Sequence, residues 1–387
     1  MRKLGFFLFS TKLAGVENHI TNLINSWPNK NDQIFLIIND NFNNFSNIQN
    51  NIKRPIFFCK YKDQLNYKNH NKKNFFQKLI VRLKFIFFLF LKKEIFFKKI
   101  LENKFDNILL VNGGYPGSFY HLLMAKSWKR FAGKKICMAI HNYPKKNNFL
   151  SFLFDIFIDL AYTNLLGGII TVSKSCQMEL KKKYFIKKLK IKTIHNGIQY
   201  INNINVKKKD KILNILMIAI YEDRKGFSFI LDCMKELKSR KLSFKLFFFG
   251  DYSSKDILEI KNLIYSRSLE KYVDIKTYQN NKLKIFSNKD LLVLPSKYEA
   301  FGLALIEAMM FKVPVIASNI GGPKEIIEDT QTGFLVNFGN IKQMCDKIEL
   351  LNTNKKLYNY IVNKAYKRYH KFFNSKLMSN KYFNLLK

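Results

Sequence analysis

The chain has 387 residues, more than one hydrophobic core normally supports, so two domains of roughly 150 to 200 residues each are expected. Its composition is 47% hydrophobic and 15% aromatic, and the apolar residues form short runs, which excludes a disordered chain. The formal net charge of +39 has two explanations: attraction to anionic lipid, nucleic acid or phosphorylated ligands, or lysine accumulated on solvated faces through compositional bias.

Short apolar runs alternate with segments of helical length, which is the pattern of a doubly wound parallel sheet. In the first half of the chain, strands are predicted at residues 4–9, 33–38, 107–111, 135–140 and 168–172. A second series follows a lysine-rich stretch after residue 200, with strands predicted at residues 214–220, 244–249, 273–277, 290–294, 313–317 and 333–336. The sequence therefore predicts two Rossmann-like domains joined near residue 200.

Residues 61–104 differ from the rest of the first half because they are strongly basic and aromatic. Apolar residues recur there at helical spacing, namely Phe76, Ile80, Leu83, Phe87 and Phe90. A spanning helix needs about 20 consecutive apolar residues, and Arg82 and Lys84 interrupt any such run. An interfacial helix with a basic rim and a buried helix of the first domain are both compatible with this pattern.

Polar and glycine residues follow several of the predicted strands. Gly15, His141, the pair Arg224 and Lys225, and Glu299 each come soon after one of these strands. In open α/β sheets, ligands bind beyond the carboxyl ends of the strands. If the two domains face each other across those edges, these residues line one cleft.

The stretch at residues 294–309 is the most informative. Good helix formers follow Gly302, so the first amides of a helix are expected to point into the cleft, where they suit a phosphate. Glu299 precedes this helix, and Glu307 lies nearly two turns inside it with a side chain that leans toward the helix start. Carboxylates in these places suit the hydroxyl groups of a sugar or ribose, although either residue alone also fits an ordinary capping or surface role.

Glu299 and Glu307, separated by seven residues with Phe301 and Gly302 between them, resemble the E-x7-E signature of the retaining GT-B glycosyltransferases of family 4. Other stretches agree with this family in order and spacing, namely residues 15–19, 171–175, 194–198, 224–226, 319–325 and 332–336. The resemblance runs from about residue 4 to residue 386 and implies an α/β GT-B fold, in which two Rossmann-like doubly wound domains face each other across a cleft. Residues 1–198 would bind the acceptor, residues 199–365 would bind the nucleotide sugar, and residues 366–387 would form a helix crossing back to the first domain.

The resemblance also implies a role for individual residues. Arg224 and Lys225 would hold the donor diphosphate, Glu307 the ribose, and Glu299 the hydroxyls of the transferred sugar. The expected catalytic residues are His141 at the sugar, Glu299 and Lys225. The expected donor-binding residues are Gly15, Arg224, Lys225, Glu299, Phe301, Gly302, Leu303 and Glu307. Many family members carry an arginine at the position of Ala219, and the sequence leaves open whether Arg224 takes its place.

The chemistry implied by the resemblance is sugar transfer without a metal. A nucleoside diphosphate is a good leaving group, and Arg and Lys in a water-poor cleft can stabilise its growing charge. No set of His, Cys, Asp or Glu has metal-ligand spacing, so no metal and no cofactor are expected besides the nucleotide-sugar substrate. The implied reaction transfers a hexose or N-acetylhexosamine from a UDP- or GDP-sugar to a glycan or lipid-linked acceptor, as in lipopolysaccharide or capsule synthesis.

The basic charge and the cysteines predict the cellular location of the protein. Lysines near an anionic membrane surface favour binding to it, so a peripheral place on the inner face of the cytoplasmic membrane is expected. The five cysteines are far apart and form no C-x-x-C pair, which is typical of a reducing cytosol.

Two alternative functions are compatible with parts of the sequence. An epimerase of GT-B shape acting on sugar nucleotides would need additional acid and base carboxylates in the cleft, of which the sequence offers few. A nucleic-acid-binding protein would need a stacking platform or a reading motif, which the dispersed basic residues lack. No nucleic-acid partner is therefore expected.

Overall fold

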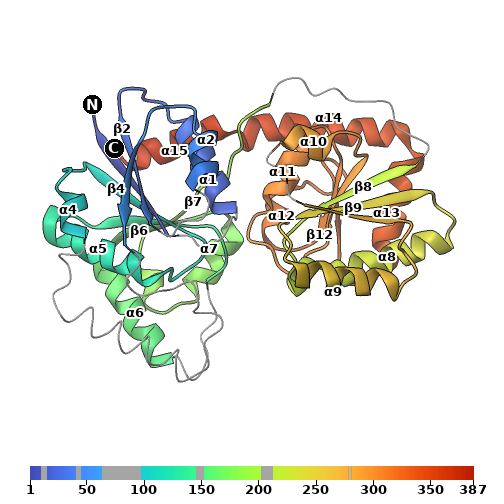
Figure 1. The fold of residues 1–387 in the computed structure, drawn as a ribbon, viewed down its shortest axis with the longest axis horizontal. Coiled ribbons are helices and arrows are strands. Elements are labelled where there is room, and N and C mark those ends of the chain that lie inside the picture. Colours follow the sequence, from blue (N-terminus) through green and yellow to red (C-terminus); the bar gives the residue numbers. More distant parts are fainter. Residues whose placement is uncertain are drawn as a thin grey trace. The chain divides into compact units, whose positions relative to one another are not determined.

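The computed structural model describes residues 1–9, 15–40, 45–62, 97–144, 152–201, 212–277, 279 and 281–387. It divides into two compact units (Figure 1). The first unit contains Met1–His195 together with Ser375–Lys387, and the second contains Asn196–Asn374. Each unit is an open parallel sheet covered by helices.

The first unit is built on a seven-stranded sheet with the order β3-β2-β1-β4-β5-β6-β7. Its strands are β1 (Lys3–Leu8), β2 (Gln33–Asn39), β3 (Phe57–Tyr61), β4 (Asn107–Asn112), β5 (Ile136–Ile140), β6 (Leu166–Thr171) and β7 (Ile191–Thr193). Its helices are α1 (Gly15–Asn25), α2 (Phe45–Asn51), α4 (Lys98–Leu101), α5 (Phe119–Ala132), α6 (Phe152–Leu165), α7 (Lys174–Lys181), the 3-10 turn η4 (Ile186–Lys188) and α15 (Ser375–Leu385). The central strands are buried on both faces, which explains why they read as continuous apolar runs.

Successive side chains of β1 point to opposite faces of this sheet and separate two hydrophobic cores. Phe7 belongs to a core that includes residues of α5 and α6, whereas Phe6 belongs to a core that includes residues of α1 and α15. The hydroxyl of Ser379 on α15 donates to the carbonyl of Leu23 on α1 at 3.0 Å. The last helix of the chain is therefore part of the first unit.

The unit boundaries differ from the predicted domain boundaries by a few residues. The first change of unit lies after His195 rather than after residue 198, and the return lies before Ser375 rather than at residue 366. Residues 366–374 stay with the second unit because the hydroxyl of Tyr369 donates to the carbonyl of Ile198 at 3.1 Å. The amide of Ile198 in turn donates to the carbonyl of Phe373 at 3.0 Å.

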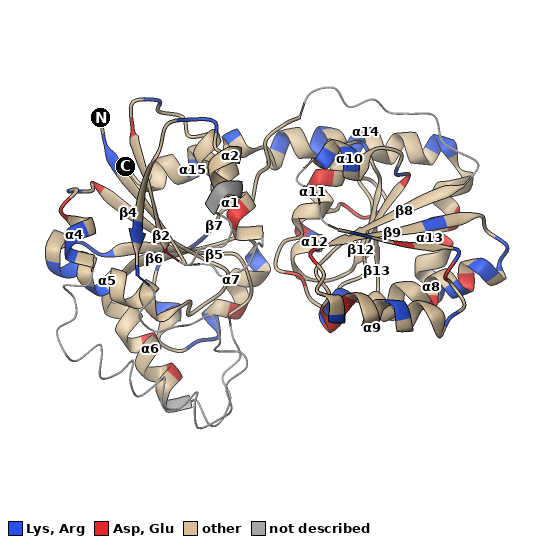
Figure 2. Ribbon diagram, viewed as in Figure 1, with Lys and Arg blue, Asp and Glu red and all other residues tan. Residues whose placement is uncertain are grey.

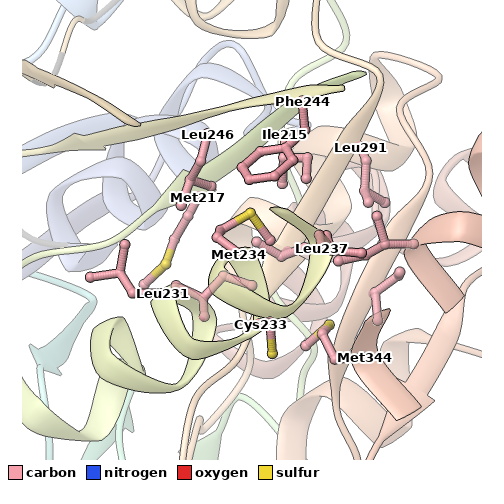
Figure 3. Close-up of a cluster of buried hydrophobic side chains, with 14 of the residues drawn as sticks. Ile215, Met217, Leu231, Cys233, Met234, Leu237, Phe244, Leu246, Leu291 and Met344 are labelled. Carbon is pink, nitrogen blue, oxygen red and sulfur yellow. The ribbon is translucent and has the colours of Figure 1, made fainter. Parts of the chain in front are cut away.

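The second unit is built on a six-stranded sheet with the order β10-β9-β8-β11-β12-β13. Its strands are β8 (Leu213–Ile218), β9 (Phe244–Gly250), β10 (Val273–Thr277), β11 (Leu291–Leu294), β12 (Val315–Ser318) and β13 (Phe334–Val336). Its helices are η5 (Asp223–Lys225), α8 (Phe227–Ser239), α9 (Ser254–Tyr265), α10 (Lys282–Phe286), α11 (Leu303–Met310), α12 (Gly321–Ile326), α13 (Ile341–Thr353) and α14 (Lys355–Phe372). Side chains of α8 such as Leu231, Cys233 and Met234 pack between β8, β9 and α13 in its core (Figure 3).

The eleven predicted strands are all present, and their ends agree with the prediction to within two residues. Two further strands, β3 and β7, were not predicted because they are short edge strands that contain lysines. Of residues 61–104, the structure describes only 61–62 and 97–104, so the helix predicted there lies outside the described residues. None of the described helices is long and apolar enough to span a membrane.

Candidate functional site

The predicted donor-binding residues of the second unit lie at the carboxyl ends of β8 and β11. These neighbouring strands are the point where the strand order reverses, because the chain runs from β8 outward to β9 and β10 and then returns to β11 on the other side. Loops diverge at such a reversal and leave space for a ligand. The loop after β8 carries Arg224 and Lys225, and the loop after β11 carries Glu299.

These two loops pack directly against each other. The amide of Lys297 donates to the carbonyl of Arg224 at 2.7 Å. Gly226 has a φ of +78°, and a Cβ added there would lie 1.9 Å from the carbonyl oxygen of Pro295. Only glycine allows this conformation and this close approach. The glycine therefore places the loop bearing Lys225 beside the loop bearing Glu299.

Lys225 and Arg224 converge on the carboxylate of Glu299. The Nζ atom of Lys225 lies 2.6 Å from Oε2 of Glu299, and Nη1 of Arg224 lies 3.9 Å from the same oxygen. Nε of Arg224 also pairs with Glu222 at 2.5 Å. The side chains of Arg224, Lys225 and Glu299 are only 13% to 17% exposed. Two cations and one carboxylate thus share a largely desolvated place, where charge interactions are stronger than in water.

Glu307 has a cationic partner that the sequence did not reveal. It lies inside α11 with a side chain 9% exposed, and Nζ of Lys282 lies 2.9 Å from its Oε1 and 3.0 Å from its Oε2. Lys282 is the first residue of α10, which follows β10 along the chain. Because both carboxylate oxygens contact the same ammonium group, the Glu307 side chain is held in one position.

The start of α11 lies between the two glutamates. Gly302 precedes the helix with a φ of +101°, and no side chain of the described residues caps the first turn, which begins at Leu303. Uncapped amides at a helix start can accept an anion. The ring of Phe301 is buried in an edge-to-face contact with Phe373, with ring centroids 6.1 Å apart, so only its backbone is placed to meet a ligand.

The candidate residues of the first unit lie on two other elements. Gly15 is the exposed first residue of α1, and His141 directly follows β5. The backbone amide of His141 donates to the carbonyl of Asn112 at 3.1 Å, which ties it to the end of β4. Both ring nitrogens of His141 are buried and have no hydrogen-bond partner among the described residues. Burial, followed by the nearby His19, holds the pKa of His141 well below its ordinary value.

A second histidine of this unit, His121 on α5, is structural. Its Nδ1 lies 2.8 Å from the hydroxyl of Ser118 and its Nε2 lies 3.1 Å from the carbonyl of Val111. The side chain is fully buried, and burial lowers its pKa to about 4.

The buried histidines make the stability of the protein depend on pH. Their pKa values lie below the unfolded value of about 6.5, so the unfolded chain takes up protons that the folded chain does not. The stability present above pH 6.5 is therefore lost as the pH falls toward 4. Through His121 alone, we expect the free energy of unfolding to fall by about 3 kcal/mol, measured by urea denaturation from pH 7 to pH 4.

The control for this pH dependence is His121→Asn, which keeps a polar side chain but cannot titrate. Its unfolding free energy is expected to change less between pH 7 and pH 4 than that of the wild type. Equal slopes in the two proteins would contradict the assignment.

Metal ligation has no support in the described part of the chain. Within it, no three His, Cys, Asp or Glu side chains lie close enough together to hold a metal ion. All five cysteines are free thiols, and Cys176, Cys233 and Cys345 are buried.

Two family models match the chain, one for each unit. The model for Glycosyltransferase Family 4 matches residues 13–200, and the model for Glycosyl transferases group 1 matches residues 198–368. Together they span nearly the whole chain in the order of the two domains. The chain belongs to the GT-B glycosyltransferases of family 4.

Relatives of this family 4 chain include proteins named for capsular polysaccharide biosynthesis and for N-acetylglucosamine transfer to poly(ribitol-phosphate). It is 26% identical to the poly(ribitol-phosphate) alpha-N-acetylglucosaminyltransferase of Staphylococcus aureus over 66% of this chain and 50% of that one. It is 27% identical to the capsular polysaccharide biosynthesis glycosyltransferase CapM of Staphylococcus aureus over 54% of this chain and 58% of that one. The chain thus spans about half the length of these two curated relatives.

Solved structures show the same fold. The HepE protein of Anabaena, crystallised with UDP and glucose, superposes with a TM-score of 0.73 over 100% of this chain and 99% of that one, at 16% identity. A glycosyltransferase from Rickettsia africae superposes with a TM-score of 0.75 over 100% of this chain and 98% of that one, at 19% identity. The fold predicted for this family 4 chain from its sequence, with two Rossmann-like domains, is confirmed.

The structure brings together most of the predicted residues of the second unit. Arg224, Lys225 and Glu299 form one cluster, and Glu307 lies on the helix that begins just after that cluster. Sequence reasoning missed Lys282, whose only local signal is its place after a predicted strand. It also assigned no role to His19, which the structure places against His141.

Proposed function

We propose that this family 4 chain transfers a hexose or N-acetylhexosamine from a UDP- or GDP-sugar to a glycan or lipid-linked acceptor, with retention of anomeric configuration. The acceptor would belong to a bacterial surface polysaccharide or lipopolysaccharide. The observation that carries the proposal is the cluster of Lys225, Arg224 and Glu299 at the strand-order reversal of the second sheet. Relatives named for N-acetylglucosamine transfer to poly(ribitol-phosphate) and for capsular polysaccharide biosynthesis support the substrate class.

The cations of the cluster suit the donor diphosphate. Sugar transfer breaks the bond between the anomeric carbon and the phosphate oxygen, so negative charge grows on that oxygen. Lys225 and Arg224 are already ordered around a carboxylate, so they need little reorganisation when a diphosphate arrives. The uncapped amides at Leu303 add partial positive charge. Because this set supplies the stabilisation itself, we propose that no metal is required.

The two glutamates suit the hydroxyl groups of the donor. Glu299 would accept hydrogen bonds from the transferred sugar, and Glu307, held by Lys282, would accept them from the ribose. His141 of the first unit would contact the sugar, and the backbone at Gly15 would approach the phosphates and acceptor. In a same-face reaction the leaving phosphate oxygen accepts the proton of the attacking acceptor hydroxyl, so the carboxylates need only bind and orient.

Thermal unfolding with nucleotide sugars tests this proposal. We expect stabilisation by a UDP- or GDP-sugar and little by ADP- or CMP-sugars. A ligand present at a hundred times its Kd stabilises the folded protein by about 2.7 kcal/mol. The donor found in this way is then incubated with candidate acceptors, and the anomeric configuration of the product is read by NMR. A protein that none of these donors stabilises would overturn the proposal.

We also propose that the protein binds an anionic membrane surface. The segment first considered for this role, residues 61–104, lies mostly outside the described residues. Basic residues occur on both units (Figure 2), but residues 181–192 hold seven lysines and no acidic residue. Tyr184 in this segment is 61% exposed, and Nζ of Lys187 lies 4.6 Å from the centre of its ring. An exposed aromatic ring among lysines suits an anionic lipid interface.

Sedimentation with vesicles tests the membrane proposal. The wild type is expected to sediment with phosphatidylglycerol vesicles at moderate salt and not with phosphatidylcholine vesicles. Each lysine near such a surface contributes about 1 kcal/mol, so neutralising Lys187 and Lys188 with glutamine should weaken binding about thirtyfold. The matched control neutralises the exposed Lys255 and Lys261 of α9. A wild type that ignores anionic vesicles would overturn this proposal and leave the transferase proposal standing.

A further inference from the structure

Two histidine rings lie against each other inside the first unit. The ring centroids of His19 and His141 are 4.0 Å apart, and the ring planes are inclined by 54°. His19 comes from α1, whose first residue is Gly15, and its side chain is 1% exposed. These two residues are far apart in the sequence, so only the packing of α1 beside the end of β5 brings them together.

We infer that His19 is a positioning residue for His141, which fixes the plane of that ring and keeps it uncharged where it meets the transferred sugar. This inference rests on the proposed function, because the contact of His141 with the sugar is part of that proposal. His19 itself need not touch the substrate.

The surroundings of His141 explain why its ring needs such a partner. Neither ring nitrogen has a hydrogen-bond partner among the described residues, so hydrogen bonds to them do not orient the ring. The backbone amide of His141 donates to the carbonyl of Asn112 and fixes the start of the side chain. The ring itself is positioned by its contact with the ring of His19. His19 is supported on another side by Tyr382 of α15, with ring centroids 5.5 Å apart and planes inclined by 62°. Tyr382 of α15 therefore packs against His19, and His19 packs against His141.

The titratable groups around this pair favour a neutral His141. His19 comes from α1, and Tyr382, which contacts His19, comes from α15. Burial raises the pKa of Tyr382, so its hydroxyl stays neutral at physiological pH. Burial and the neighbouring imidazole both lower the pKa of His141. Two imidazolium groups at this distance would repel each other, so the pair resists protonation.

A neutral imidazole has a chemical advantage at this place. The sugar carbon becomes positively charged as the bond to the phosphate breaks, and a cationic ring beside it would oppose that change. A neutral imidazole can still donate one hydrogen bond and accept another. Both ring nitrogens of His141 are buried and have no hydrogen-bond partner among the described residues, so a sugar hydroxyl can pair with one of them only if donor binding uncovers it.

The test compares His19→Gln with His19→Phe in the full-length protein. NMR titration of labelled histidines in the absence of substrate reports the pKa of His141 directly, with His141→Gln used to assign its signal. We expect this pKa to rise in His19→Gln, because water and a smaller side chain replace the buried ring. In His19→Phe, which preserves the packing and cannot carry charge, we expect a smaller rise.

Activity provides a second readout. In His19→Gln the acid limb of the kcat profile should move to higher pH, and kcat should recover as the pH rises while the KM for the donor changes little. If the His141 pKa comes to lie one unit above the assay pH, kcat falls about tenfold. A pKa of His141 that is the same in both variants as in the wild type would overturn the inference. Failure of the wild type to use any nucleotide sugar would overturn the proposed function, while the titration would still decide the role of His19. If His19→Gln does not fold, the titration of His19→Phe decides alone.

Discussion

Replacing Lys225 by alanine is expected to weaken donor binding by about tenfold to a hundredfold and to lower kcat by about a hundredfold to a thousandfold. The ammonium group is the nearest cation to Glu299, at 2.6 Å, and it lies in a place only 13% exposed. A charge-assisted hydrogen bond to a phosphate contributes about 1.5 to 3 kcal/mol to binding, and a preorganised donor at growing charge contributes a further hundredfold or more in rate. Arg224 remains nearby, so a small residual activity is expected.

Titration calorimetry with UDP and GDP, together with kcat for the accepted donor, measures this effect. Lys225→Arg keeps the charge and should retain part of the affinity. The matched control is Lys255→Ala on α9, whose side chain is 83% exposed and remote from the cluster in sequence. Undiminished nucleotide binding by Lys225→Ala would remove this lysine from the donor site.

Replacing Glu299 by glutamine is expected to lower kcat by a similar factor while nucleotide affinity is retained or increased. The carboxylate of Glu299 neutralises Lys225 and Arg224 in the structure. Without it, Lys225 loses its carboxylate partner and Arg224 keeps only its pair with Glu222, so UDP or GDP should bind at least as tightly. The sugar, in contrast, loses an anionic acceptor for its hydroxyl groups, and it becomes more costly to develop positive charge at its reacting carbon.

The opposite effects of these two changes on nucleotide binding separate the proposed roles. Calorimetry with the bare nucleoside diphosphate reports the phosphate contacts, and steady-state kinetics reports the sugar contacts. Glu259→Gln on the exposed face of α9 is the matched control for the loss of one carboxylate. If Glu299→Gln loses affinity for UDP and GDP as strongly as Lys225→Ala does, then the carboxylate acts mainly by orienting the lysine.

The position of Arg224 bears on a question that the sequence left open, namely whether Arg224 takes the place of the arginine that many family members carry at the position of Ala219. The position where many family members carry an arginine is Ala219, which lies just after β8 and is 7% exposed. Arg224 approaches Glu299 from the same loop as Lys225, although its shortest contact is with Glu222. It is therefore placed to supply the second positive charge of the cluster.

The C-terminal aromatic residues divide between the two units. Tyr369 and Phe373 pack in the second unit, whereas Tyr382 packs in the first. Phe372 and Leu377, which lie between Tyr369 and Tyr382 in the sequence, are partly exposed.

The sequence by itself determined the two sheets and singled out the residues now proposed for the donor site. Parallel strands buried on both faces must be apolar throughout, so runs such as residues 33–38 and 244–249 are visible without a structure. Glu299 and Glu307 could be identified because both lie near one helix start, where spacing along the chain fixes spacing in the molecule. Lys225 was also recognisable from the sequence, because it directly precedes Gly226 in the loop after a predicted strand.

The tertiary structure alone decided which residues complete these sites. Lys282 is one of 67 Lys and Arg residues, and its only local signal is its place after a predicted strand. Only the packing of α10 shows that its ammonium group lies 2.9 Å from Glu307. His19 acquires a role only because α1 packs beside the end of β5, and Tyr382 joins it only because α15 returns to the first unit. Contacts between separate elements depend on how those elements pack, and packing is a property of the whole fold that no local pattern records.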